Sequence, residues 1–355
     1  MRPLAFDRVP LGVRHRVPTE ASGQRGAASA GGSRASGSAA IGRDTPLPFR
    51  GLSVEPAPCA AGVGGYPACF GTSGAITSYT PRNGRTERIA TGFPSVINDF
   101  SVFGQHDIDA SHGRIFVVFG LGAEMSTRKG LSPAARGLAQ TGTIDRNGRL
   151  RPVGDLLAFE ERYNPHRADV NANAYGITRV PGGTLVAEAG GNDILWVSSD
   201  SGSVRILALM PDQVIDGSPS ESVPSAIVRG PDGAFCISEY GGEPNRMGKA
   251  RIRRSCPVET DRRDERVHRI IDLTFDRQGR MLVLELAEQG FYSPDRTGRL
   301  VRIEHNGKRT VLAREGLEHP GGVTVAPNDD IYPTNRTTSL GEANGQLLRL
   351  RPGRS

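Results

Sequence analysis

Residues 173–210, NAYGITRVPGGTLVAEAGGNDILWVSSDSGSVRILALM, decide the fold of this chain. They contain four short apolar runs, which are separated by the turn sequences PGG, GGND and DSG. The runs are Tyr175–Val180, Thr184–Ala187, Ile194–Ser198 and Val204–Met210. Short runs rich in Val, Ile, Leu and Thr between Gly, Asn and Asp residues are typical of strands joined by hairpins. The stretch therefore predicts a four-stranded antiparallel meander.

The same pattern of strands and turns recurs along the chain. The other copies are Phe70–Ala90, Gln105–Val153, Pro224–Cys256, Ile270–Ala313 and Pro320–Leu350. A spacing of roughly 45–55 residues is in the range of repeat architectures. A unit that cannot bury both of its faces alone packs against its neighbours. We therefore predict an all-β fold, a six-bladed β-propeller of four-stranded antiparallel blades that spans residues 48–355 as one domain.

The N-terminal region differs from the rest of the chain. Residues 1–47 are rich in Arg, Gly, Ser and Ala and poor in apolar residues, so we predict a disordered tail. The first copy, Phe70–Ala90, is the most degenerate one, and the first blade is predicted to be incomplete. The chain ends soon after the third strand of the last unit, so we expect the N-terminal region to supply its fourth strand. Prolines 46, 48 and 56 let the segment PLPFRGLSVEP pair only weakly with the last sheet, so we expect a poorly sealed ring.

Charge and hydropathy exclude two classes of partner. The net charge is +6, but residues 1–50 contain eight arginines and three acidic residues, which leaves the predicted propeller almost neutral. A nearly neutral body lacks the basic surface that nucleic-acid binding requires. No run approaches the roughly 18 apolar residues of a membrane span. We expect a monomer that binds neither nucleic acid nor a membrane.

The four cysteines fall into two pairs. Cys59 and Cys69 lie in a Gly-rich segment, and we expect them to form a disulfide, which would indicate an exported protein; two incidental thiols are the alternative. Cys236 lies in a predicted strand, roughly opposite Arg253 and therefore not opposite Cys256, which argues against a disulfide between the two cysteines. We expect both to be buried free thiols.

Two segments interrupt the repeat and are predicted to form short helices between strands. They are residues 123–141 and 155–172. Insertions of this kind lie at the rim of a propeller face and often take part in binding.

A polar residue recurs at the end of the second strand of several units, 13 or 14 residues after the start of the first strand. These residues are Glu188, Glu239, Glu285 and Asn335, and Phe119 takes the position in the second unit. If they converge at one mouth of the channel, they could hold Ca²⁺ or another divalent cation. The alternative is that each side chain binds backbone N–H groups of a neighbouring strand.

Further polar residues lie near the starts of the first strands. They are His106, Asp107, Asn173, Asp272 and His319, which we predict to bind a ligand at the channel mouth. The chain has no nucleophile elbow, phosphate-binding loop, dinucleotide motif or zinc motif. Catalytic residues therefore stay unknown.

These residues carry a resemblance to a known family. The runs DLLAFEERYNP and VNANAYGITRVPGGTLVAEAGGNDILWV, with QHDID, FVVFGLG and PCAAG, closely resemble the ScyD/ScyE family of bacterial six-bladed propellers over about residues 58–350. This family belongs to the NHL/gluconolactonase-like propeller superfamily. The resemblance implies a link to secondary metabolism but no catalytic residue. It also implies export, yet neither a signal peptide nor the family's first-blade phrase precedes Cys59, so a cytoplasmic location stays open.

Three functions remain. The first is a propeller that binds a small molecule or a protein at its loop face. The second is a metal-dependent lactonase or esterase-type hydrolase that uses the predicted carboxylates. The third is a metal-free enzyme like strictosidine synthase, which an apolar-lined pocket beside His106 would favour.

Overall fold

The computed structural model describes most of the predicted propeller and four short strands ahead of it. The described residues are 66–98, 102–111, 113–242, 247–255, 268–291, 293–338 and 345–351, with the strand segments 6–8, 33–34, 47–51 and 59–63. All statements about the structure below refer to these residues. Within them, no helix is long and apolar enough to cross a membrane.

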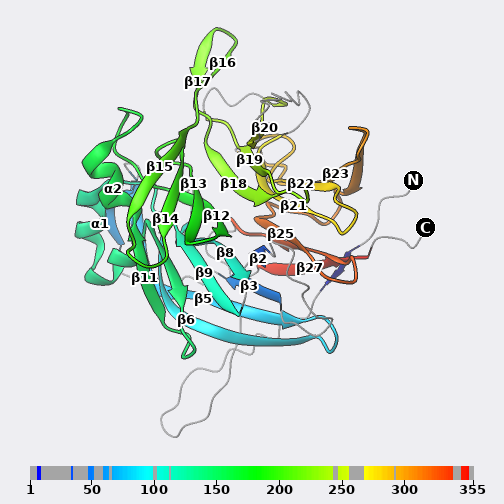
Figure 1. Cartoon of the computed structure of the whole chain (residues 1–355), viewed down its shortest axis with the longest axis horizontal. Helices are drawn as coiled ribbons and strands as arrows, with labels where there is room; N and C mark the ends of the chain where they lie inside the picture. Colours follow the sequence, from blue (N-terminus) through cyan, green and yellow to red (C-terminus); the bar gives the residue numbers. More distant parts are fainter. Residues whose placement is uncertain are drawn as a thin grey trace, which may run out of the picture.

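Six sheets are arranged as the blades of a propeller, which confirms the predicted fold (Figure 1). The third sheet has the meander predicted from residues 173–210. Its strands are β12 (Ala174–Val180), β13 (Gly183–Glu188), β14 (Asp193–Ser198) and β15 (Val204–Leu209). The fifth sheet repeats this order with β21 (Ile270–Phe275), β22 (Met281–Glu285), β23 (Arg299–Ile303) and β24 (Arg309–Ala313).

The other sheets depart from four strands in their described parts. The fourth consists of β18 (Pro224–Arg229), β19 (Phe235–Glu239) and β20 (Arg251–Ser255), and the hairpin β16 (Gln213–Ile215) and β17 (Ser218–Ser220) precedes it. The second consists of β2 (Ser33–Arg34), β8 (Gln105–Ser111), β9 (Arg114–Phe119), β10 (Gln140–Ile144) and β11 (Leu150–Asp155). The first consists of β3 (Leu47–Gly51), β4 (Cys59–Val63), β5 (Tyr66–Thr80), β6 (Arg85–Asn98) and β7 (Val102–Phe103).

The last sheet takes its fourth strand from the N-terminal region, as predicted, but this strand lies within residues 1–47, which the sequence predicts to be disordered. It contains β25 (Gly322–Val325), β26 (Ile331–Asn335) and β27 (Gln346–Leu350), and the N-terminal strand β1 (Phe6–Arg8) pairs antiparallel with β27. The segment around the N-terminal prolines does not perform this closure, because its strand β3 pairs with β5. Whether the rest of residues 1–47 is disordered stays a prediction.

The two insertions form short helices, as predicted. They are α1 (Met125–Leu131), the 3-10 helix η1 (Pro133–Gly137) and α2 (Leu156–Tyr163). Asp155 caps α2 by accepting a hydrogen bond from the Ala158 N–H at 3.0 Å, and it also pairs with the buried Arg128 of α1. This shared carboxylate ties the two helices together beside the second sheet.

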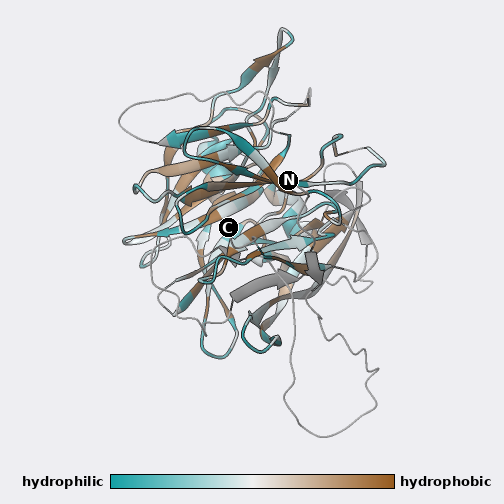
Figure 2. Ribbon diagram, turned by 90° about the vertical axis from the view of Figure 1, so that its right-hand side faces the viewer, coloured by the Kyte–Doolittle hydropathy of each residue, from teal (hydrophilic) through white to brown (hydrophobic). Residues whose placement is uncertain are grey.

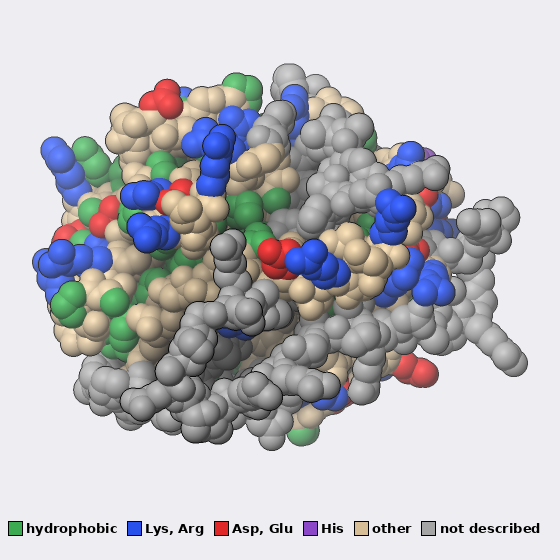
Figure 3. Space-filling model, turned by 90° about the horizontal axis from the view of Figure 1, so that it is seen from below, with side chains coloured by type: hydrophobic (Ala, Val, Ile, Leu, Met, Phe, Trp, Pro, Cys, Tyr) green, Lys and Arg blue, Asp and Glu red, His purple; other side chains and the backbone are tan. Residues whose placement is uncertain are grey.

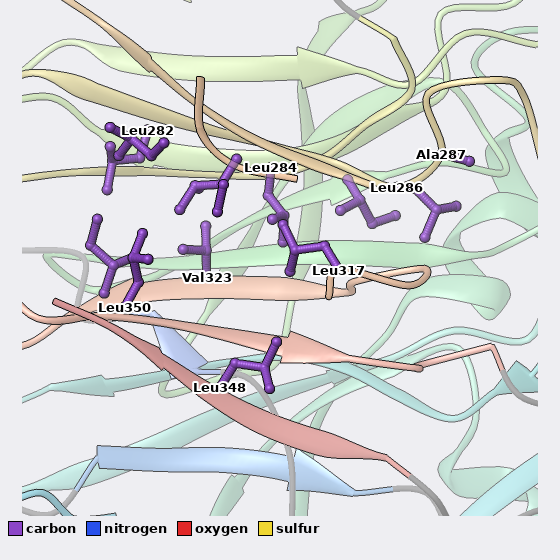
Figure 4. Packing of buried hydrophobic residues seen from close by; sticks show 13 residues of the cluster. Leu282, Leu284, Leu286, Ala287, Leu317, Val323, Leu348 and Leu350 are labelled. Atoms are coloured by element: carbon purple, nitrogen blue, oxygen red, sulfur yellow. The ribbon is translucent and has the colours of Figure 1, made fainter. Parts of the chain in front are cut away.

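Hydrophobic side chains fill the spaces between adjacent sheets. Figure 2 shows hydrophobic residues concentrated in the strands and hydrophilic residues in many of the turns. Between the fifth and sixth sheets, Leu282 and Leu284 of β22 share a core cluster with Val323 of β25 and Leu350 of β27 (Figure 4). Such packing of each blade against its neighbour is what makes the repeat stable.

The cysteines lie in the predicted environments where the structure describes them. Cys59 of β4 and Cys69 of β5 are direct register partners, and Cys69 is disulfide-bonded. This register is the one that the predicted disulfide requires. Cys236 is a buried free thiol, but it lies opposite Arg254, one residue from the predicted Arg253. Cys256 is outside the described residues.

Candidate functional site

A one-residue bulge recurs at the start of the first strand in four successive sheets. In β8, Gln105 pairs with Phe119 and Asp107 pairs with Val118, so His106 is an extra residue in the ladder. The equivalent extra residues are Tyr175 in β12, Ser225 in β18 and Ile271 in β21. A bulge changes the direction in which a side chain points and is frequent beside functional sites.

The four bulge residues line one cavity of about 390 Å³ where these first strands begin. Aromatic rings supply much of its wall, namely Phe103, His106, Tyr175, Tyr240 and Phe291. The rings of His106 and Tyr175 are stacked, with centroids 4.3 Å apart. Polar groups reach the cavity from Asn173, Glu221, Ser225, Arg269 and Thr338. The site is therefore a mainly aromatic pocket with a few polar groups.

His106 is held in one orientation. Its Nδ1 lies 3.0 Å from the carbonyl oxygen of Ala174. Because a carbonyl only accepts hydrogen bonds, Nδ1 carries a hydrogen, and when the ring is neutral Nε2 is its acceptor atom. Gly120 is required beside it, since a Cβ at this position would collide with the His106 ring and with Oδ1 of Asn173.

A residue with positive φ lies just before the first strand of the fourth, fifth and sixth sheets. Val223, Arg269 and His319 have φ of +50°, +33° and +39°. The carbonyls of Val223 and Arg269 accept hydrogen bonds from Tyr240 N at 2.9 Å and Leu286 N at 3.0 Å. Positive φ is unfavourable for such side chains, and residues of this kind cluster at functional sites.

His319 lies directly behind the cavity wall. Its ring stacks on Phe291 with centroids 5.6 Å apart, and its Nδ1 is hydrogen-bonded to Oγ1 of Thr338. Burial, together with the positive charges of Arg296 and Arg269, lowers the pKa of His319 to about 4. The ring is therefore neutral at physiological pH.

Among the residues predicted to bind a ligand, His106 and Asn173 line the cavity and His319 supports it. Asp107 and Asp272 do not line it. Oδ2 of Asp107 accepts a hydrogen bond from Ile177 N at 2.9 Å, and Oδ2 of Asp272 accepts one from Val323 N at 2.8 Å. Each of these two carboxylates therefore joins the first strand of its own sheet to that of the next.

The predicted metal ligands serve structural contacts in their own parts of the ring. Glu239 is fully buried and pairs with Arg251 at 2.5 Å and with Arg253. Glu285 pairs with Arg299 at 2.7 Å, and burial raises its pKa while Arg299 lowers it. Within the described residues, no group of three or more His, Cys, Asp or Glu side chains is placed to hold a metal ion.

The other two predicted ligands cap backbone groups. Asn335 accepts a hydrogen bond from Glu318 N at 2.7 Å and donates one to the Gly316 carbonyl at 2.9 Å. Glu188 accepts hydrogen bonds from the N–H groups of Asn173 and Gly191. These contacts are those expected from the alternative explanation of the repeat, in which each side chain binds neighbouring backbone.

Glu188 also belongs to a group of buried carboxyls with Glu160 of α2 and Asp193 of β14. Burial raises the pKa of Glu188 to about 7, against the effect of its backbone hydrogen bonds, and Glu160 adds to the rise. Burial raises the pKa of Asp193 to about 9, and Glu188 and Glu160 add to this. Glu160, Asn173 and the turn at residues 190–193 thus meet here, and all three belong to the runs that resemble the ScyD/ScyE family.

Sequence reasoning missed most of the cavity wall, including Arg269, Tyr240 and Phe291. Arg269 could have been found, because it stands two residues before the repeated strand start, where Asn173 and His319 stand in other units. Tyr240 directly follows Glu239 and could have been found in the same way. Phe291 lies in the loop after β22, where no repeated position marks it.

On the face in Figure 3, lysine and arginine side chains lie in separate groups, several of them with acidic neighbours. Ion pairs such as Arg85–Glu87 and Arg336–Glu318 neutralise part of this charge.

The chain matches no protein-family model and no curated protein. It is similar in structure to a gluconolactonase from Xanthomonas campestris, with 9% identity, coverage of 92% and 99% of the two chains, and a TM-score of 0.48. A calcium-binding regucalcin from Agrobacterium tumefaciens has 14% identity, coverage of 85% and 92%, and a TM-score of 0.47. An inactive variant of virginiamycin B lyase from Staphylococcus aureus, solved with quinupristin, has 15% identity, coverage of 81% of both chains and a TM-score of 0.42. At these identities and TM-scores, none of them assigns an activity to this chain.

Proposed function

We propose that this propeller binds a small planar aromatic molecule in the cavity where the first strands of four sheets begin. The observation that carries the proposal is the repeated bulge, which directs His106, Tyr175, Ser225 and Ile271 into one space. Four independent sheets thus share a local departure from regular pairing, and its common result is the cavity.

The shape and chemistry of the cavity suit such a ligand. Its volume of about 390 Å³ lies within the range of small-molecule sites. Aromatic side chains offer flat, polarisable surfaces, on which an aromatic ligand gains about 0.5–1.5 kcal/mol per ring pair beyond its burial. The polar groups are few, which is typical of sites where they set orientation.

The same cavity supports a second candidate, a metal-free enzyme. An apolar-lined pocket beside His106 is the feature that separates this function from the metal-dependent one, and the cavity provides it. His106 with its hydrogen on Nδ1 would present Nε2 as a general base. The lactonase alternative has less support, because arginines already neutralise Glu239 and Glu285.

Membership of the ScyD/ScyE family and export are part of this proposal. The motif runs meet around Glu188, and the register of Cys59 and Cys69 suits a disulfide, which persists in oxidising compartments. Both features favour an extracytoplasmic binding protein that acts in secondary metabolism.

Binding can be tested by isothermal titration with naphthalene-2-carboxylate and naphthalene-2-carboxamide as probes. We expect at least one probe to bind wild-type protein, and Tyr175→Ala to weaken that binding about tenfold, because the variant removes a ring from the cavity wall. Tyr163→Ala is the matched control, since Tyr163 is 58% exposed on α2. Failure of both probes to bind, or equal weakening by the two variants, would contradict the proposal.

A further inference from the structure

Arg269 is a buried cation without an anionic partner. Its residue is only 8% exposed, it lies directly before β21, and it lines the cavity. The neighbouring arginines of the ring differ in this respect, because Arg251 pairs with Glu239 and Arg299 pairs with Glu285. No carboxylate among the described residues forms an ion pair with Arg269.

The contacts that Arg269 makes leave other N–H donors of its guanidinium accessible from the cavity. The group lies over the rings of Tyr240 and Phe291, at 5.0 Å and 5.9 Å from their centroids, and Nη1 donates a hydrogen bond to Tyr240 Oη at 2.8 Å. A guanidinium has five N–H donors. Cation–π contacts offset only part of the cost of burying a charge. The remaining donors can bind an acceptor that enters the cavity.

Glu221, the acidic residue that lines the cavity, does not fulfil this role. Its side chain is on the exposed rim, where Oε1 accepts a hydrogen bond from Asn192 Nδ2 at 3.2 Å. His319, which stacks behind Phe291, is uncharged near neutral pH. The end of the cavity beside Tyr240 and Phe291 is therefore positively charged.

The backbone of Arg269 has a strained conformation. Arg269 has φ of +33°, and its carbonyl is held by the N–H of Leu286 at 3.0 Å. Residues in this backbone region are unfavourable unless the surrounding structure holds them, and they cluster at ligand sites.

We infer that the cavity takes an aromatic carboxylate, whose ring lies among the aromatic side chains and whose carboxylate binds Arg269. This inference rests on the proposed function and adds the chemical class of the ligand. Planar bidentate pairing with a carboxylate is the interaction for which a guanidinium is best suited.

The two naphthalene probes test the inference on wild-type protein, because they share a ring system and differ in charge. We expect naphthalene-2-carboxylate to bind about tenfold to hundredfold more tightly than naphthalene-2-carboxamide. Equal affinities would overturn the assignment of Arg269 but leave the aromatic cavity in place. If neither probe binds, the proposed function itself fails, and this inference fails with it.

Variants of two arginines test whether Arg269 is the cation that binds the carboxylate. We expect Arg269→Met to abolish the preference for the carboxylate and Arg269→Lys to retain part of it, with thermal melting used to select folded protein. Arg296→Met is the control, since Arg296 is exposed, acts electrostatically on the same His319 and does not line the cavity. A preference that survives in Arg269→Met but disappears in Arg296→Met would overturn the inference. Should Arg269→Met not fold, the comparison of the probes on wild type and on Arg269→Lys still decides the matter.

Discussion

Glu239 shows how single residues of this ring combine burial with charge. Its carboxylate has no exposed surface, and it forms ion pairs with Arg251 and Arg253 of the adjacent strand β20. Burying one charge is unfavourable unless the partner is close and the remaining hydrogen bonds are made. The buried carboxylate thus depends on both Arg251 and Arg253.

Removing the Glu239 charge should destabilise the protein strongly. We expect Glu239→Gln to lower the free energy of unfolding by about 3 kcal/mol, because two partly buried arginines lose their partner. Urea denaturation measures this loss. Glu87→Gln is the control: its pair with Arg85 is exposed, and we expect less than about 1 kcal/mol. Similar losses in the two variants would show that burial does not decide the effect.

At the level of elements, the turn between β13 and β14 brings three carboxyls together beneath α2. Gly191 allows this approach, since a Cβ there would lie within 3.0 Å of Glu188 and 3.2 Å of Glu160. No basic side chain of the described residues lowers the pKa of Glu188 or Asp193. Both therefore retain their protons to higher pH than exposed carboxyls.

This group should make stability fall as pH rises. A carboxyl whose pKa is raised on folding binds more protons in the folded state, so its contribution is present below the unfolded pKa, near 4, and is lost as pH rises through about 7 for Glu188 and about 9 for Asp193. We expect Asp193→Asn to flatten the decline in melting temperature between pH 5 and pH 9, and to melt above wild type at about pH 9. Asp200→Asn, in an exposed turn of the same sheet, is the control. An unchanged profile in Asp193→Asn would rule out the group as the cause.

At the level of the whole molecule, the ring depends on one pairing between distant parts of the chain. Strand β1 covers the outer edge of the sixth sheet, with Asp7 opposite Arg349. Without it, β27 would present an unpaired edge, and the Leu348 and Leu350 side chains of the core between the fifth and sixth sheets would lie on the outermost strand.

Breaking this closure should loosen the sixth sheet first. We expect Asp7→Pro, which removes a backbone donor, to lower the melting temperature and to increase hydrogen exchange in β27 more than in β12 to β15. Asp7→Ala keeps the donor and should leave exchange in β27 near the wild-type level. If the proline variant changes exchange equally in all sheets, or in none, the pairing of β1 does not close the ring.

The sequence determined the secondary structure and the number of blades, because turn residues and short apolar runs are local signals. Residues 173–210 show this best, since each predicted run became a strand of the third sheet. The repeat also placed Glu188, Glu239 and Glu285 correctly at strand ends. It did not determine their partners, because Arg251 and Arg299 come from the next strand and reach them only through the cross-strand register.

The tertiary structure alone decided which side chains meet in the cavity. Alternation along a strand predicts which face a residue occupies, but a bulge at His106 or Tyr175 changes that face without a sequence signal of its own. Arg269 looks like one more arginine in a chain rich in them. Its role depends on the packing of separate sheets, which buries it beside Tyr240 and Phe291 without an ion pair to a described carboxylate. Burial and the distance between charges are properties of the folded ring.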